Sequence, residues 1–471
     1  MTSPVGPSLA RVTVAAPTRR MDIALPDNMI VAELLPHLLR HAGDALGDAA
    51  PERPGGWALR RATGTTLEPQ RNLAVQGVRD GELLHLTPTR DDWPELAYDD
   101  VVEVIAGGAR RAGRAWSAAA TRRTGLVVTA VALLVGLIGL ALAGPSWTLP
   151  AFIALAVAVA LTVVGVLLSR AFADAGAGAV VAAAGLPYAF FGGAWLITPK
   201  ESGFLGIGAA GLLLGSAVLL VAGVIGNIGV AGLPRLFTAG IATAVTGLIA
   251  ALLCVAGLSA AGAAAVTLTV AIGLLPSYPV VASWIGRLPF PELPSRAEEI
   301  LKDKPMPKRA DVFAAVVRAS EVLTGLLLAA SIASIVAIVY LVTAGDRGVA
   351  VVLLIVDAVV ALLLRARLLP TPQQRIPLLI SGLAGAAVLG GGAAFDALGT
   401  KAGLLLLAIA AVIAAVALTS GLVFGRRAPS PYVGRTGDIL DVIAIMALIP
   451  LACTVIGIFD AIRGLFASIG G

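Results

Sequence analysis

Asp357 is the residue whose position most suggests chemistry, because it is the one acidic residue near the middle of a long apolar segment in this 471-residue sequence. An ionisable side chain at bilayer depth is costly and by default marks a functional site. Ion-coupled transport usually gathers several polar groups near the membrane midplane, whereas the apolar segments here contain no His, Lys or Glu. Ion coupling at Asp357 is therefore a hypothesis for which the sequence supplies no partner groups.

Other candidates for a metal or catalytic site are weak. His37 and His41 stand one helical turn apart, but no cysteine or third histidine stands beside them, which makes a poor zinc motif. Cys254 and Cys453 lie within apolar runs without partner spacing, so neither a disulfide framework nor a cysteine metal site is expected. The sequence also lacks a Walker A motif, HExxH and GxSxG. We predict no catalytic residue, no metal and no cofactor, and we do not expect an enzyme.

Composition indicates a membrane protein with a separate soluble domain. Hydrophobic residues make up 58% of the chain and charged residues 13%, against about 25% charged residues in a soluble domain. Residues 1–103 carry a net charge of −5, and residues 104–471 carry a net charge of +10. Two differently built regions are therefore expected to join near residue 100.

The apolar runs predict eleven transmembrane helices, since a spanning helix needs about 20 apolar residues. We place them near residues 125–143, 149–168, 176–198, 203–225, 236–257, 260–283, 322–343, 348–364, 376–395, 402–424 and 437–459. The least well-marked boundaries are around Pro187 and around Pro276 and Pro279. Twenty basic residues flank these spans on the N-terminal side of the membrane and four on the other. This asymmetry places the N-terminus in the cytoplasm, and the odd number of spans places the C-terminus outside.

The only long loop, residues 284–321, falls on the cytoplasmic side. Ser295 and Glu298 form a capping box for a short helix at 296–303, and Asp311 is placed to cap a helix leading into the seventh span. A solvated connector and a docking surface both fit this loop, because a long, locally structured loop among short ones tends to have a partner.

Glycine is frequent inside the predicted spans. Gly211 and Gly215 form a GxxxG step, and Gly382, Gly385 and Gly390–Gly392 line the ninth span. Small residues allow helices to approach closely. Packing within one chain is favoured over a seam between two copies.

Residues 1–90 have the pattern of a small domain of strands and one helix. Apolar residues from Ile30 to Leu39 recur on one helical face, with Asp27 as the expected N-cap and Gly43 as the expected stop. Pro36 predicts a kink or a late start of this helix. Strands are predicted at residues 9–15, 20–25, 57–61 and 83–87, with a short turn or a further strand at 72–78.

This order of elements resembles the ubiquitin-like β-grasp fold. Thr66-Leu67-Glu68, Asn72-Leu73 and the run from Gly81 to Leu86 look like the later half of such a domain, where a short turn region leads into the last strand. No Gly-Gly tail follows that strand. The resemblance therefore implies a binding module, without the conjugation function.

The whole chain resembles EccD, the polytopic membrane component of the type VII (ESX) secretion system. The resemblance rests on a multi-domain arrangement: a cytoplasmic ubiquitin-like domain in 1–90, a basic linker in 91–124 and an all-α transmembrane bundle in 125–471. It implies a multi-pass scaffold of the bacterial inner (plasma) membrane that docks the ATPase and other core subunits through its cytoplasmic domain. The implied partners are EccB, the EccC ATPase, EccE, a second copy in a homodimer and membrane lipids, with no nucleic acid.

A secondary transporter with a regulatory ubiquitin-like domain is the alternative reading. The scarcity of polar groups within the spans favours the scaffold, because coupled transport needs several of them near the midplane.

Overall fold

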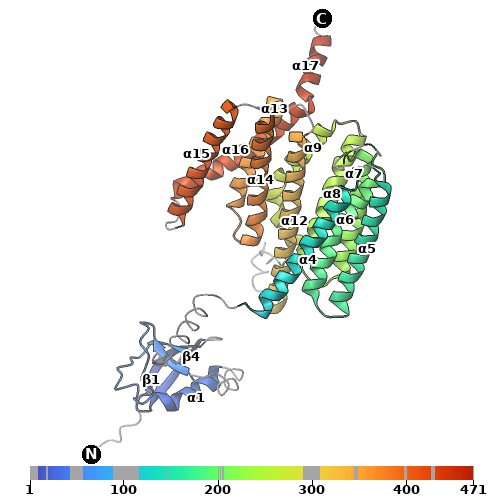
Figure 1. Ribbon diagram of the computed structural model, residues 1–471. Helices are drawn as coiled ribbons and strands as arrows, with labels where there is room; N and C mark the ends of the chain where they lie inside the picture. The colour runs from blue at the N-terminus through green and yellow to red at the C-terminus, as the bar shows by residue number, and fades with distance from the viewer. Residues whose placement is uncertain are drawn as a thin grey trace, which may run out of the picture. The chain divides into compact units, whose positions relative to one another are not determined.

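The computed structural model describes residues 9–16, 20–42, 57–88, 116–144, 146–199, 201, 203, 206–289, 308–343, 348–396, 400–425 and 430–469. The chain divides into two compact units, Met1–Ala115 and Trp116–Gly471. Among the described residues, every strand belongs to the first unit and the long apolar helices belong to the second (Figure 1).

The first unit is a four-stranded sheet in the order β2-β1-β4-β3. β1 (Leu9–Ala15) and β2 (Arg20–Pro26) form an antiparallel hairpin, and β3 (Trp57–Arg61) pairs antiparallel with β4 (Leu83–Pro88). β1 and β4 run parallel at the centre. The four predicted strands all form. Residues 72–78 form turns, with one isolated bridge from Asn72 to Ile30.

α1 (Val31–Ala42) packs its apolar face onto this sheet. Leu34 and Leu38 are buried, as are Val12 of β1 and Leu84 of β4, and all four belong to one core. Residues four apart on a helix share a face, and alternate residues of a strand share a face. The apolar face of the helix and the apolar face of the sheet therefore pack together in a single core.

The start of α1 differs from expectation. Asp27 is not its N-cap, because the helix begins at Val31. The first helical N–H groups are satisfied instead by backbone carbonyls: Val31 N–H donates to Arg71 at 3.1 Å and Ala32 N–H donates to Pro69 at 3.0 Å. Of the two outcomes predicted at Pro36, a kink or a late start, the late start does not occur, since the helix runs from Val31 through Pro36. Gly43, the predicted stop, lies outside the described residues.

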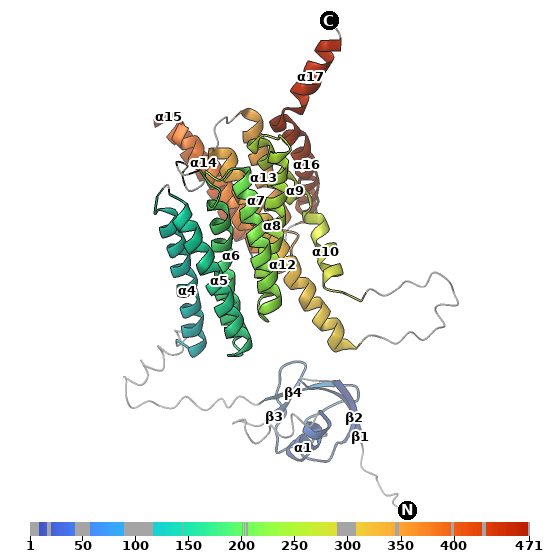
Figure 2. The same cartoon turned by 90° about the vertical axis from the view of Figure 1, so that its right-hand side faces the viewer.

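The second unit is a bundle of antiparallel helices (Figure 2). Successive spans alternate in direction, as short connections between spanning helices require. The helices are α4 (Ala118–Ala141), α5 (Thr148–Arg170), α6 (Ala175–Trp195), α7 (Ala209–Gly229), α8 (Pro234–Val255), α9 (Ala260–Gly273), η1 (Leu275–Ser277), α10 (Tyr278–Ile285), α12 (Arg309–Thr343), α13 (Val349–Ala366), α14 (Pro372–Asp396), α15 (Thr400–Phe424), α16 (Pro431–Ile456) and α17 (Ile458–Ile469).

Among the described residues, ten helical segments are long and apolar enough to cross a membrane. Each of them overlaps one of the eleven predicted spans, with ends that differ by several residues in most cases. The eleventh, 402–424, falls within the 25-residue helix α15. The chain is therefore a multi-pass membrane protein.

Proline acts differently in two spans. α6 continues through Pro187 without interruption. The sixth span is instead divided into α9, η1 and α10 at Pro276 and Pro279. A proline cannot donate the intrahelical hydrogen bond, so two prolines three residues apart interrupt the ladder more severely than one.

The long loop ends earlier than expected. α12 starts at Arg309 and runs unbroken for 35 residues, so Asp311 lies in its first turn instead of capping it. The short helix predicted at 296–303 lies outside the described residues.

The last span stops before the end of the predicted range 437–459. α16 ends at Ile456, because Gly457 adopts a left-handed backbone (φ 84°) and α17 begins after it.

Glycine permits close helix contacts within this one chain. A Cβ on Gly165 of α5 would lie 2.7 Å from the carbonyl oxygen of Gly178 on α6. A Cβ on Gly215 of α7 would lie 2.7 Å from the carbonyl oxygen of Phe190 on α6, and one on Gly211 would lie 3.0 Å from that of Ala194. The GxxxG step on α7 thus packs against α6, as the favoured reading expected.

Candidate functional site: a polar belt at one end of the bundle

Charged side chains link neighbouring helices at one end of the bundle, where α5, α7 and α13 finish and α4, α6, α8, α14 and α16 begin (Figure 2). We call this set the polar belt. It comprises Arg122, Arg170, Asp174, Arg235, Glu321, Arg365, Arg367, Gln373, Arg375, Asp438 and Asp441.

The belt begins with an ion pair between α4 and the start of α6. Asp174 is the N-cap of α6, where its carboxylate accepts from the Ala177 N–H at 2.9 Å and from the Arg122 guanidinium. The Ala177 N–H and then Arg122 hold the pKa of the Asp174 carboxyl below its ordinary value of 3.8. When folding lowers the pKa of a carboxyl, the ionised carboxylate stabilises the fold at every pH above the ordinary pKa. This contribution is lost as the pH falls through the lower pKa of the folded state. The pair therefore stays intact at neutral pH.

Two arginines of the belt satisfy the carbonyl groups that end neighbouring helices. Arg170 at the end of α5 donates to the carbonyls of Gly229 and Ile228, at 2.9 and 3.0 Å, where α7 ends. Arg375 of α14 donates to the Ala366 carbonyl, at 3.0 Å, where α13 ends. The last carbonyls of a helix lack intrahelical partners and carry partial negative charge, so each arginine fastens the end of one helix to another.

Arg235 connects three helices. Its guanidinium lies 3.4 Å from Glu321 of α12 and donates to Gln373 of α14 at 2.9 Å. α12 also approaches α8 closely here, because a Cβ on Gly325 would lie 2.7 Å from the Arg235 carbonyl oxygen. The network ties α8, α12 and α14 together near the membrane boundary.

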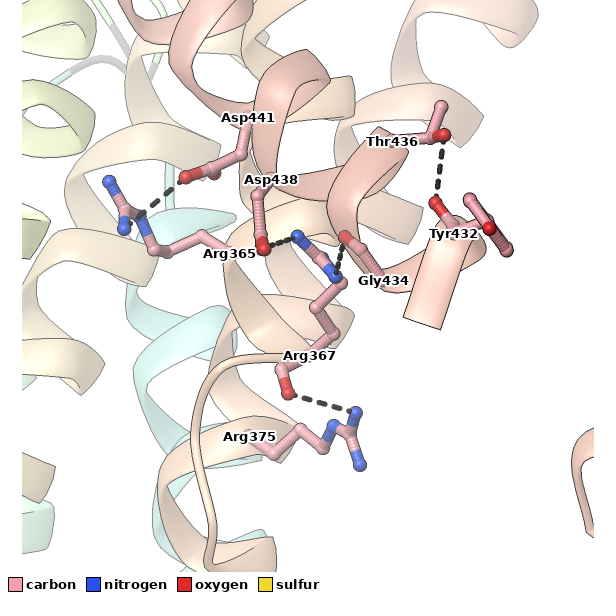
Figure 3. Close-up of polar contacts among 8 residues, drawn as sticks. All are labelled: Arg365, Arg367, Arg375, Tyr432, Gly434, Thr436, Asp438 and Asp441. Atoms are coloured by element: carbon pink, nitrogen blue, oxygen red, sulfur yellow. Dashed lines mark hydrogen bonds and ion pairs between the residues drawn. The ribbon is translucent and has the colours of Figure 1, made fainter. Parts of the chain in front are cut away.

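The most buried part of the belt joins α13 to α16 (Figure 3). Arg365 Nη1 lies 3.3 Å from Asp441 Oδ2, with the two side chains 17% and 5% exposed. Arg367 pairs with Asp438, and its Nη1 donates to the Gly434 carbonyl at 3.2 Å. A Cβ on Gly437 would lie only 2.8 Å from the Arg367 guanidinium carbon, so this glycine makes room for the arginine.

The sequence predicted that these residues lie on one side of the membrane, but it did not predict which of them form pairs. The arginines of the belt all come from segments predicted to lie on the basic, cytoplasmic side. Asp438 and Asp441 lie in the N-terminal half of α16, and the helix dipole favours acidic residues towards a helix N-terminus whether or not they have a partner. Their arginine partners lie far away in sequence, on a different helix, so only the folded bundle brings them together.

Asp357 lies in the middle of α13, away from the belt. Its side chain is partly exposed, but the Oδ2 atom is buried and has no hydrogen-bond partner. No His, Cys, Asp or Glu cluster of three or more, as a metal site would need, occurs among the described residues. Within the part of the chain that the structure describes, Asp357 thus belongs to no such cluster, and its buried Oδ2 atom has no partner of the kind that a relay would use.

His37 and His41 line a shallow apolar groove of about 260 Å³ between β2 and α1. Ile23 and Leu25 of β2 and Leu34 and Leu38 of α1 form its walls, with Pro26 and Met29 at one end. β2 is an edge strand of the sheet. The two histidines therefore border a surface suited to an apolar segment of another protein.

Comparison with known families matches both units of the chain. Residues 121–465 match the EccD-like transmembrane domain, and residues 9–86 match the YukD protein of the WXG100 protein secretion system (Wss). The chain belongs to the EccD family. The predicted fold class, a ubiquitin-like β-grasp domain followed by an all-α membrane bundle, is confirmed.

Individual relatives agree with this assignment. The ESX-4 secretion system protein eccD4 of Mycobacterium tuberculosis, from strains CDC 1551 / Oshkosh and ATCC 25618 / H37Rv, is 29% identical to this EccD over 497 residues, with 98% of each chain covered. The structure of protomer 1 of the ESX-3 core complex shares the fold, with a TM-score of 0.58 at 22% identity, over 96% of this chain and 100% of that one. The structure of the MycP5-free ESX-5 inner membrane complex, State II, also shares the fold, with a TM-score of 0.54 at 21% identity, over 88% of this chain and 99% of that one.

Proposed function

We propose that this EccD is a structural inner-membrane subunit of a type VII (ESX) secretion complex. The observation that carries the proposal is the presence, in one chain, of both an EccD-like transmembrane domain and a YukD-like domain. Its role is to build the membrane scaffold and to dock EccB, the EccC ATPase, EccE and a second copy of itself. The ATPase subunit supplies the energy for export.

Extraction in a mild detergent followed by native electrophoresis tests this proposal. We expect a complex many times larger than the 47.4 kDa of one chain, containing the ATPase subunit. A lone monomer, in cells that carry the other subunits, would contradict the scaffold and favour an independent transporter.

The orientation of the scaffold follows from its charges. The described arginines of the polar belt lie at one end of the bundle, and basic residues concentrate on the cytoplasmic side of a membrane protein. We predict that reporters fused at residue 100 and at residue 471 lie on opposite sides, with residue 100 in the cytoplasm. Activity of both reporters on the same side would refute an odd number of spans.

The β-grasp domain supplies the main docking surface. Within the described sheet, β2 pairs with β1 alone, so a strand from a partner can be added along its other side. The groove beside it, walled by Ile23 and Leu38, accepts apolar side chains from that partner. The edge strand and the groove, both in the described part of the domain, support this binding role.

A second docking surface lies at the start of α12. A 35-residue helix is about 50 Å long at 1.5 Å per residue, well beyond the roughly 30 Å of a bilayer core. The turns before Glu321 therefore extend past the polar belt. Phe313, Val316 and Val317 are exposed there, on a segment expected to face water, where a partner would bury them.

Asp357 is predicted to be dispensable for export. Asparagine has nearly the same shape, and the Asp357→Asn change breaks no ion pair because the buried Oδ2 has no partner. Export by cells that carry the variant should match the wild type when secreted substrate is measured in the culture medium. Loss of export from complexes of normal size would instead establish ion coupling at this residue.

A further inference from the structure

The C-terminal helix α17 follows the span α16 after a single residue. α16 ends at Ile456 and α17 begins at Ile458. Gly457 between them has a φ of 84° and open space around its Cα position, a conformation that glycine adopts without strain. The chain thus stops one helix and starts another at the membrane boundary, with a joint that lets the two axes diverge.

One face of α17 is apolar and uncovered. Ile458, Phe459, Ile462 and Phe466 are 40%, 46%, 44% and 69% exposed. At 3.6 residues per turn these four positions fall within an arc of about 100°, whereas Gly464 faces the other way. Figures 1 and 2 both show α17 extending beyond the other helices of the bundle.

The position of α17 indicates what covers this face. Twelve residues of helix are about 18 Å long, too short for a second crossing of the membrane. Because α17 starts where a spanning helix ends, the nearest apolar phase is the bilayer itself. Its sequence contains one acidic and one basic residue, Asp460 and Arg463. Their charges cancel, so contact with the bilayer would depend on the apolar face and not on attraction to charged lipids.

We propose that α17 turns at Gly457 and lies on the membrane surface, with Phe466 and its neighbours inserted at the boundary between lipid headgroups and acyl chains. An amphipathic helix of this kind buries its apolar face about 5–10 Å into that region. The helix anchors the end of the chain against the face of the membrane at which α16 emerges. The inference rests on the membrane-spanning character of α16 and does not depend on the proposed role in secretion.

Fluorescence quenching at single cysteines in the full-length protein tests the proposal. The natural cysteines are first replaced by Cys254→Ser and Cys453→Ser, after which Phe466→Cys and Gly464→Cys are labelled with an environment-sensitive fluorophore in lipid nanodiscs. We expect several-fold stronger quenching of the Phe466→Cys label than of the Gly464→Cys label by brominated acyl chains. With aqueous iodide the order should be reversed. Phe152→Cys on the exposed face of α5 and Thr63→Cys in the β-grasp domain provide the lipid and water references.

Three results would overturn the proposal. Equal iodide quenching at both positions would place α17 in water. Equal lipid quenching would place the whole helix within the acyl chains. Protection of both positions from both quenchers would mean that protein covers the helix, as a second copy of the chain would do. Labelled variants that retain the wild-type size-exclusion profile exclude misfolding as the cause.

Discussion

Replacing Asp441 with alanine is expected to remove most of the folded protein from the membrane. The Asp441 side chain is 5% exposed and pairs with Arg365, which is 17% exposed. Removing one partner of a buried ion pair leaves an uncompensated charge and costs about 3–5 kcal/mol. This is a large share of the 5–15 kcal/mol that typically stabilises a folded protein. Thermal melting in detergent and immunoblots of membrane fractions should both record the loss.

The same helix offers a matched control for Asp441. Asp438 lies one turn earlier on α16, and its ion pair with Arg367 leaves Asp438 61% exposed. The Asp438 carboxylate is largely in water, and Arg367, 27% exposed, keeps its hydrogen bond to the Gly434 carbonyl, so Asp438→Ala should lower the melting temperature less than Asp441→Ala does. Combining Asp441→Leu with Arg365→Met removes both buried charges and should restore much of the stability. An Asp441→Ala protein that melts like the wild type would show that the pair is not stabilising.

Deleting residues 1–90 is expected to weaken recovery of the ATPase subunit while the helical spans still insert. The β-grasp domain belongs to a compact unit that ends at Ala115, and no predicted span depends on it. Pull-down from solubilised membranes, with the truncated chain as bait, measures the loss. Undiminished recovery of the ATPase would refute docking through this domain and would direct attention to residues 284–321.

A point substitution tests the contribution of the groove independently of the rest of the domain. Ile23 on β2 lines the groove, whereas its neighbour Ala24 is exposed and does not line it. Ile23→Asp places a charge in the apolar groove and should weaken recovery of the ATPase severalfold. Ala24→Asp adds the same charge to the same edge strand and should leave recovery near the wild-type level. Equal loss in both variants would mean that the groove is not the contact.

Local patterns in the sequence were sufficient for most of the elements. Alternating residues in β1 and one-face spacing in α1 reflect burial on a single side of each element, which is a property of neighbouring residues. The spans are equally local, because a bilayer requires every crossing helix to be apolar along its whole length. Basic residues beside the spans also concentrated on one predicted side, before any contact between helices was known.

Only the tertiary structure decided which groups meet. Arg367 and Asp438 are 71 residues apart in sequence, and nothing in the local pattern of either helix selects the other. Asp27 had a residue type suited to capping α1, yet the backbone of Pro69 and Arg71 takes that role. The apolar residues just after Gly457 were predicted to belong to the last span. In the structure the left-handed backbone at Gly457 ends that helix, and these residues form a separate one. Pairing, capping and helix termination depend on groups brought together by the fold, and a one-dimensional pattern does not contain their distances.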